Sequence, residues 1–116
     1  MKEENQIMML KHYQKKSRKT ALYPDIGRNF VYPTLGLVGE AGEVAEKVKK
    51  ILRDKAGTAS TNDISEIEKE LGDVLWYVSQ LATEFGLSLE KIAQINLEKL
   101  QSRYQRGVIG GSGDNR

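Results

Sequence analysis

Residues 37–55 read LVGEAGEVAEKVKKILRDK, and this outline returns thirty positions later as IEKELGDVLWYVSQLATEF, residues 67–85. Both stretches space their apolar residues three and four positions apart, which places them on one face of a helix that turns about 100° per residue. The repeat therefore predicts two long helices of similar design. Their apolar faces comprise Leu37, Ala41, Val44, Val48 and Ile51 in the first helix and Ile67, Leu71, Val74, Val78 and Leu81 in the second.

Each stretch carries two acids at matching positions, Glu40 and Glu43 in the first and Glu70 and Asp73 in the second. Carboxylates three residues apart on a helix are neighbours, so each pair leans from the edge of the apolar face towards the core side. Four such groups on packed helices would repel one another unless a cation neutralised them. Carboxylate oxygens without Cys or His suit Mg²⁺, or alternatively Mn²⁺, better than zinc or copper. The competing interpretation is solvated helix edges, and the matched repetition argues against it.

The motifs ExGE and ExGD, in the contexts LGLVGEAGEVAEKVKK and EKELGDVLWYVSQLA, resemble the two motifs of the MazG family of all-α nucleoside triphosphate pyrophosphohydrolases. The resemblance covers most of the chain, from about Tyr13 onward. It implies an all-α fold, a small helical bundle with two antiparallel motif helices. It also implies Mg²⁺-dependent hydrolysis of a nucleoside triphosphate between the α and β phosphates, which gives a nucleoside monophosphate and pyrophosphate.

The same resemblance implies roles for the four acids and for a second subunit. Glu40, Glu43, Glu70 and Asp73 would ligate Mg²⁺, while one carboxylate, for which we choose Glu43, would orient the attacking water as general base. Members of this family usually assemble as dimers or tetramers, so a homodimer or homotetramer is expected. The alternative from another functional class is a non-catalytic helical module that binds a nucleotide or a protein.

Composition limits what the chain can be. With 116 residues, we expect residues 1–116 to form a single domain, and 39% hydrophobic with 29% charged residues is ordinary for a soluble globular protein. The absence of Cys excludes a disulfide framework. Without an apolar run of membrane-spanning length or a signal-peptide pattern, we expect a cytoplasmic protein with no membrane partner. The basic N-terminal arm is short, so nucleic-acid binding is not expected.

The remaining segments predict two more helices. A first helix is expected at residues 3–19, followed by a loop at about 20–33 that holds both prolines. Aromatic residues gather in that loop, where they either pack it onto the bundle or stack on a nucleobase. These are Tyr23, Phe30 and Tyr32. For the first motif helix we expect Thr34 as the N-cap and Gly57 as the C-cap. For the second we expect a capping box at its start, formed by Asp63 with Glu66 or by Ser65 with Glu68, and Gly86 at its end. Ser88 is expected to cap a last helix over residues 89–105.

Asn96, Lys99 and Arg103 share one stripe of that last helix. The stripe is either a solvated polar face or, as the family resemblance implies, the segment that contacts phosphate, for which the Lys point charge and the Arg fork are suited. The tail after it, residues 107–116, holds four glycines and reads as flexible. Alternatively the tail folds over bound nucleotide, with Asp114 or Arg116 reaching the site.

Trp76 lies about half a turn from the apolar stripe of its own helix, on the side opposite the core. A large aromatic side chain is costly to leave in water. It is therefore expected to be covered either by a neighbouring helix of the same chain or by a second subunit.

Overall fold

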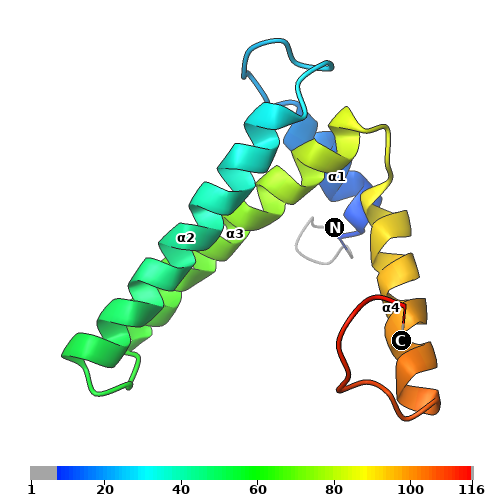
Figure 1. Ribbon diagram of the computed structural model, residues 1–116. Coiled ribbons are helices and arrows are strands. Elements are labelled where there is room, and N and C mark those ends of the chain that lie inside the picture. The colour runs from blue at the N-terminus through cyan, green and yellow to red at the C-terminus, as the bar shows by residue number, and fades with distance from the viewer. Residues whose placement is uncertain (1–7, 116) are drawn as a thin grey trace, which may run out of the picture.

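The computed structural model describes residues 8–115, which contain helices and no strand, so the expected all-α class is confirmed. Helices α2 and α3 lie side by side and run antiparallel as one arm (Figure 1). Helix α1 crosses the end of this hairpin, and α4 packs mainly on α1 and extends away as a second arm. The helices are α1 (Leu10–Arg18), α2 (Val31–Asp54), α3 (Thr61–Glu84) and α4 (Leu89–Gln105).

The hairpin of α2 and α3 is the largest contact between elements, as the repeat of two amphipathic stretches predicts. The Tyr77 ring of α3 lies directly against α2 at Gly36, where an added Cβ would come 2.2 Å from the ring. No side chain larger than hydrogen fits there without a shift, so Gly36 allows the two helices to approach closely beside the acidic motifs.

Helix α2 begins four residues earlier than expected, at Val31 with Phe30 as its N-cap, so the prediction of Thr34 as the N-cap is wrong. The physical reason lies in the loop before it. The Asn29 side-chain oxygen accepts a hydrogen bond of 3.0 Å from the Tyr32 backbone N–H, which satisfies one of the free donors of the first turn. Pro33 then sits inside that turn, where its missing N–H costs nothing.

Helix α3 also begins earlier, at Thr61, and both expected capping boxes are wrong. Ser60 is the cap: its Oγ accepts 3.1 Å from the Asp63 N–H, and the Asp63 carboxylate accepts 2.9 Å from the Ser60 N–H. Lys55 Nζ, from the end of α2, adds 2.8 Å contacts to that carboxylate and closes the hairpin turn. The expected caps Gly86 and Ser88 are confirmed, since Gly86 has positive φ directly after α3 and Ser88 Oγ accepts from Lys91 N. The expected cap Gly57 is wrong by one position, because Ala56 takes the left-handed conformation after the C-cap Lys55 and Gly57 follows it.

Polar side chains tie helix α1 to the rest of the molecule. Ser17 Oγ lies 3.0 Å from Ser79 Oγ and accepts a bond of 3.0 Å from Gln80 Nε2, and both α3 residues are fully buried. The Gln14 side chain bonds the Leu89 N–H at 2.8 Å, which ties the start of α4 to α1. The first part of the expected helix, residues 3–7, lies outside the described residues.

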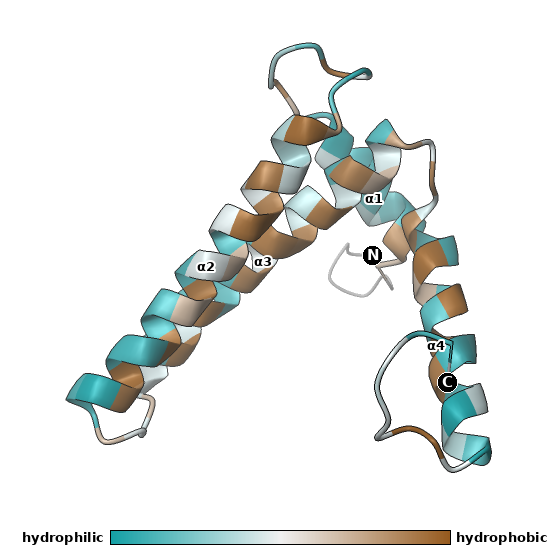
Figure 2. Ribbon diagram, viewed as in Figure 1, coloured by the Kyte–Doolittle hydropathy of each residue, from teal (hydrophilic) through white to brown (hydrophobic). Residues whose placement is uncertain are grey.

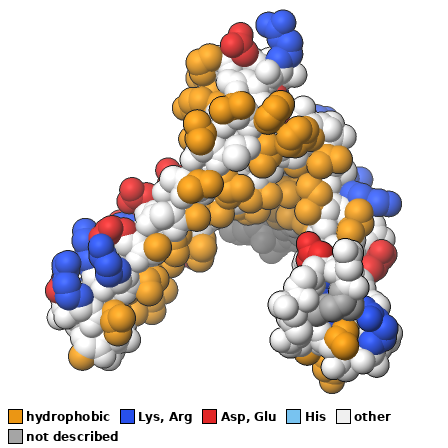
Figure 3. All heavy atoms as spheres, in the orientation of Figure 1, with side chains coloured by type: hydrophobic (Ala, Val, Ile, Leu, Met, Phe, Trp, Pro, Cys, Tyr) orange, Lys and Arg blue, Asp and Glu red, His pale blue; other side chains and the backbone are white. Residues whose placement is uncertain are grey.

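Among residues 8–115, few large apolar side chains are buried. Of the predicted apolar faces, Ile51 is 9% exposed, but Val48 and Leu71 are 49% and 53% exposed. Apolar residues lie along both arms, and many remain on the surface (Figures 2 and 3). No helix among residues 8–115 is long and apolar enough to cross a membrane. The single chain therefore leaves much of its apolar surface in contact with water.

Candidate functional site

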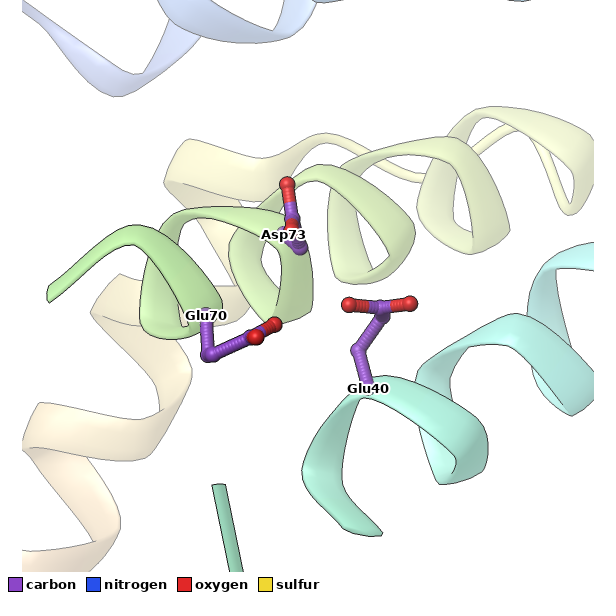
Figure 4. Close-up of side chains that lie close together, drawn as sticks. All are labelled: Glu40, Glu70 and Asp73. Carbon is purple, nitrogen blue, oxygen red and sulfur yellow. The ribbon is translucent and has the colours of Figure 1, made fainter. Parts of the chain in front are cut away.

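Three of the four motif acids come together between α2 and α3. Glu40 projects from α2 towards Glu70 and Asp73 on α3, and each of the three offers one oxygen within 4.8 Å of the others (Figure 4). Glu40 and Glu70 are half-buried and Asp73 is exposed, so the group opens to solvent on one side. We call these residues the acidic triad. Antiparallel packing of the two motif helices brings it together.

The acidic triad is electrostatically unsatisfied. Burial and then the charges of Asp73 and Glu70 raise the pKa of Glu40 above its usual range. Lys47 lies nearest as a counter-charge, with its Nζ 3.7 Å from a Glu70 oxygen, and this partial pairing does not reverse the shift on Glu40. The repulsion that the repeat predicts is therefore present in the folded chain.

The triad has the chemistry and the size of a Mg²⁺ or Mn²⁺ site. All its donors are carboxylate oxygens, which are the ligands that hard divalent cations prefer. Two oxygens on one Mg²⁺ are at most about 4.2 Å apart, because each bond is about 2.0–2.1 Å long. The triad oxygens, within 4.8 Å of one another, need only small side-chain movements to reach that geometry.

Glu43 is not part of this group in the structure. Its carboxylate is exposed, one turn further along α2, and it does not belong to the set of acids that share the 4.8 Å limit. Glu46, a turn beyond, pairs with Lys49 at 2.9 Å on the surface of α2. Among the acids of α2, only Glu40 therefore faces α3 as a ligand would.

Aromatic side chains border the acidic triad. Tyr77 lies one turn beyond Asp73 on α3, and burial, followed by the neighbouring Tyr32 and Glu40, raises its pKa. Tyr32 stacks on the buried Tyr23 with ring centres 4.9 Å apart and remains 43% exposed. Burial, and then the charge of Asp73, raises the pKa of Tyr13 from α1. Sequence reasoning missed Tyr77, Tyr13 and Lys47, although the spacing of four from Asp73 to Tyr77 was a usable signal.

A second cluster that sequence reasoning missed is built around Glu84, whose carboxylate is fully buried at the end of α3. It accepts bonds of 2.9 Å from Arg18, 2.5 Å from the Tyr23 hydroxyl and 2.8 Å from the Asn29 N–H. Burial alone would raise the pKa of Glu84, but these bonds and one from Gly27 N–H lower it to about 2. We call this cluster the Glu84 clasp. It fixes the loop that leads into α2.

The expected phosphate-contacting residues lie on α4, in the second arm, and not beside the acids (Figure 1). Arg103 is buried, and its Nη2 donates 2.7 Å to the Asp114 backbone oxygen and 3.3 Å to the Asp114 carboxylate. Lys99 Nζ donates 3.3 Å to the same carboxylate. Asn96 is exposed. Arg116, the other tail residue considered, lies outside the described residues.

Trp76 is covered in part by its own chain. Its Nε1 donates 2.9 Å to Thr20 Oγ1, and its ring meets Tyr77 edge-on with ring centres 5.0 Å apart. Its side chain is half-buried. Of the two expectations for Trp76, a contact within its own chain is therefore present, and Thr20 in the segment after α1 contributes to it.

The sequence of this chain is similar to one protein-family model and to two known proteins. Residues 33–108 match the family model of the MazG nucleotide pyrophosphohydrolase domain. The chain is 53% identical over 109 residues to the gene 37 protein of Mycobacterium phage L5, covering 90% of this chain and 96% of that protein. It is 34% identical over 74 residues to the uncharacterized protein YvdC of Bacillus subtilis strain 168, covering 60% of this chain and 70% of that protein. No solved structure matches the chain significantly.

Proposed function

The chain belongs to the MazG nucleotide pyrophosphohydrolase domain family, and we propose that it hydrolyses a nucleoside triphosphate with Mg²⁺ as cofactor. Water adds across the bond between the α and β phosphates, and a nucleoside monophosphate and pyrophosphate leave. The observation that carries the proposal is the acidic triad, which gathers three carboxylate oxygens within 4.8 Å from both motif helices.

Glu40, Glu70 and Asp73 would hold the metal ion, and Mn²⁺ is an alternative occupant of the same oxygen ligands. When bound, Mg²⁺ would screen the phosphate charge and acidify a water molecule. The raised pKa of Glu40, which follows from burial and from its two acidic neighbours, supports a site that gains from a cation.

We assign Glu43 as the general base, and it remains a candidate ligand as well. It lies one turn beyond Glu40 on α2, and its exposed carboxylate is accessible to a water molecule. A carboxylate outside the acidic triad is free to accept a proton from that water while the triad holds the cation.

Lys99 and Arg103, with Asn96 beside them, would hold the departing pyrophosphate. Within one chain these residues sit on the second arm, away from the acidic triad. The proposal therefore includes a homodimer or homotetramer, in which α4 of one copy approaches the hairpin of another. A closed symmetric assembly would supply every site with both charges.

The exposed apolar surface supports such an assembly. Large apolar side chains that are more than half exposed occur on both hairpin helices and on α4. A soluble monomer rarely leaves so many large apolar groups in water when they lie together along one element. They include Leu35, Val38 and Leu52 on α2, Ile64 and Leu71 on α3, and Leu97 and Tyr104 on α4.

The deciding experiment is turnover. The protein is incubated with a panel of nucleoside triphosphates and Mg²⁺, and the pyrophosphate and monophosphate released are measured. We expect equal amounts of the two products and loss of both in excess EDTA. Release of inorganic phosphate instead, or no release from any triphosphate, would reject the proposed reaction and favour a non-catalytic binding module.

A further inference from the structure

After α4 the tail loops away and returns to the side of that helix (Figure 1), where Asp114 contacts Lys99 and Arg103, to which we assign phosphate binding. Gly107 and Gly113 adopt φ of +75° and +86°, a region that other residues rarely enter, and they allow this reversal. The Val108 N–H donates 2.9 Å to the Arg103 backbone oxygen, which starts the return path at the end of the helix. The tail thereby brings Asp114 beside Lys99 and Arg103.

Asp114 presents to these cations what a phosphate would present. Its carboxylate Oδ1 accepts from Lys99 Nζ and from Arg103 Nη2, each at 3.3 Å. Arg103 also donates to the backbone oxygens of Gly113 and Asp114, at 3.3 and 2.7 Å. A carboxylate and a phosphate each present a pair of negative oxygens that the N–H donors of a guanidinium group can bind.

The Asp114 carboxylate nevertheless leaves one hydrogen-bond donor of Arg103 without a partner in residues 8–115. Arg103 Nε is buried and has no hydrogen-bond partner among the described residues. A phosphate group, with more acceptor oxygens and more charge than one carboxylate, could satisfy Nε and Nη2 together. The Asp114 side chain is 81% exposed, so its ion pairs are weakened by water and can be exchanged readily.

We propose that residues 107–115 act as an internal competitor, in which Asp114 occupies the cationic residues of α4 until a pyrophosphate group displaces it. The inference rests on the proposed function for its ligand class, and it concerns how access to that site is regulated. The same residues that bind the ligand are closed by the chain's own tail. Binding therefore requires the tail to leave, and the affinity is lowered by the fraction of molecules in which it is closed.

The test is calorimetric binding of inorganic pyrophosphate in EDTA, with the full-length chain and no turnover. Asp114→Asn and Asp114→Ala should both bind roughly three- to tenfold more tightly, as expected when a state closed in about 70–90% of molecules is opened. Glu90→Gln is the matched control, because it also removes one acid but lies at the start of α4, about 13 Å along the helix axis from Lys99. This variant should bind pyrophosphate as the wild type does. Lys99→Ala in the Asp114→Asn background should abolish the gain.

Unchanged or weaker binding in either Asp114 variant overturns the proposal, and weaker binding would instead make the tail a part of the ligand site. The wild type supplies a second readout, since pyrophosphate should shift the NMR amide signal of Gly113 towards that of a mobile chain. The outcome is separable from hydrolysis. Tighter binding in a protein without turnover would keep the competitor and reject the enzyme, whereas turnover with unchanged binding would do the reverse.

Discussion

The two arms of the molecule carry opposite charges for the same proposed ligand, and they differ in whether those charges are already paired within the chain. On the hairpin, Glu40 lies against two other acids, and burial and that repulsion raise its pKa. On the second arm, Lys99 and Arg103 are already paired, with the Asp114 carboxylate of the tail. A bound cation would therefore relieve repulsion on the hairpin, whereas a phosphate that binds to α4 must first displace the Asp114 carboxylate. Metal affinity and phosphate affinity should for that reason respond to different substitutions.

The largest effect is expected from the acidic triad. Glu40→Gln or Asp73→Asn should lower kcat/KM by roughly a thousandfold or more, because each removes a charged ligand of the metal ion. The helical circular dichroism should be retained, since neutralising one acid relieves repulsion in the metal-free protein.

Glu46→Gln is the control for the acidic triad, because it neutralises an acid of the same helix that forms a salt bridge with the surface residue Lys49. It should keep full activity. If Glu40→Gln or Asp73→Asn is as active as the wild type, or if the wild type works in excess EDTA, the metal centre is elsewhere and the contrast between the arms fails.

The next effect concerns the Glu84 clasp, which joins the hairpin end to the loop before α2. The pKa of Glu84 is about 2 when folded and about 4.5 in its ordinary state, so the charged clasp contributes about 3 kcal/mol to the free energy of unfolding. Because the folded pKa is the lower one, this stability is present above pH ~4.5 and is lost as the pH falls towards 2.

Urea unfolding at a series of pH values measures that contribution. Glu84→Gln should be less stable than the wild type by about 3 kcal/mol at pH 7, and the difference should shrink between pH 4.5 and 2. Glu68→Gln, at an exposed position of the same helix, should follow the wild type throughout. A constant difference at all pH values would mean that the charge of Glu84 contributes nothing.

On the second arm, Lys99→Ala and Arg103→Ala should lower kcat/KM by roughly ten- to thousandfold, alone or together, since charge-assisted contacts contribute about 1.5–3 kcal/mol each. Lys91→Ala, at an exposed position of α4 about two turns before Lys99, is the control. Steady-state pyrophosphate release measures the change. Normal activity in both variants would mean that Lys99 and Arg103 do not bind phosphate and serve only to hold the tail on α4.

The smallest effect is expected from the contact between copies. Leu52 is 71% exposed on α2, so Leu52→Glu should cost little in one subunit but should bury a charge at a subunit contact and shift the mass towards monomer. Light scattering at micromolar concentration measures this, with Lys50→Glu as control. A wild type of 13.0 kDa in solution would remove the second copy from the proposal. Trp76 is a poorer probe, because Thr20 and Tyr77 contact it within the chain.

Local pattern was enough to predict the two motif helices and the closeness of Glu40, Glu70 and Asp73. The repeat at 37–55 and 67–85 places Glu40, Glu70 and Asp73 on facing edges, and antiparallel packing follows from a short turn. Glu43 shows the limit of spacing alone, because helical turn fixes its distance from Glu40 but not whether that edge faces α3.

The remaining contacts join residues that are far apart in the sequence. Glu84 binds partners about sixty positions earlier, and no periodicity links a buried acid on α3 to the backbone of a distant loop. The early start of α2 has a similar cause, since it depends on the Asn29 side chain and on a proline that is harmless in the first turn. Single-sequence patterns do not carry such information.

Because few apolar residues are buried within one subunit, the proposed activity should depend on the protein concentration. If hairpin and α4 from different copies complete each site, turnover per chain falls on dilution below the dissociation constant and recovers on concentration. Association would stabilise the folded state, so the midpoint of thermal unfolding would rise as the protein concentration increases. The number of molecules present would then set both how long each one survives and how fast it works.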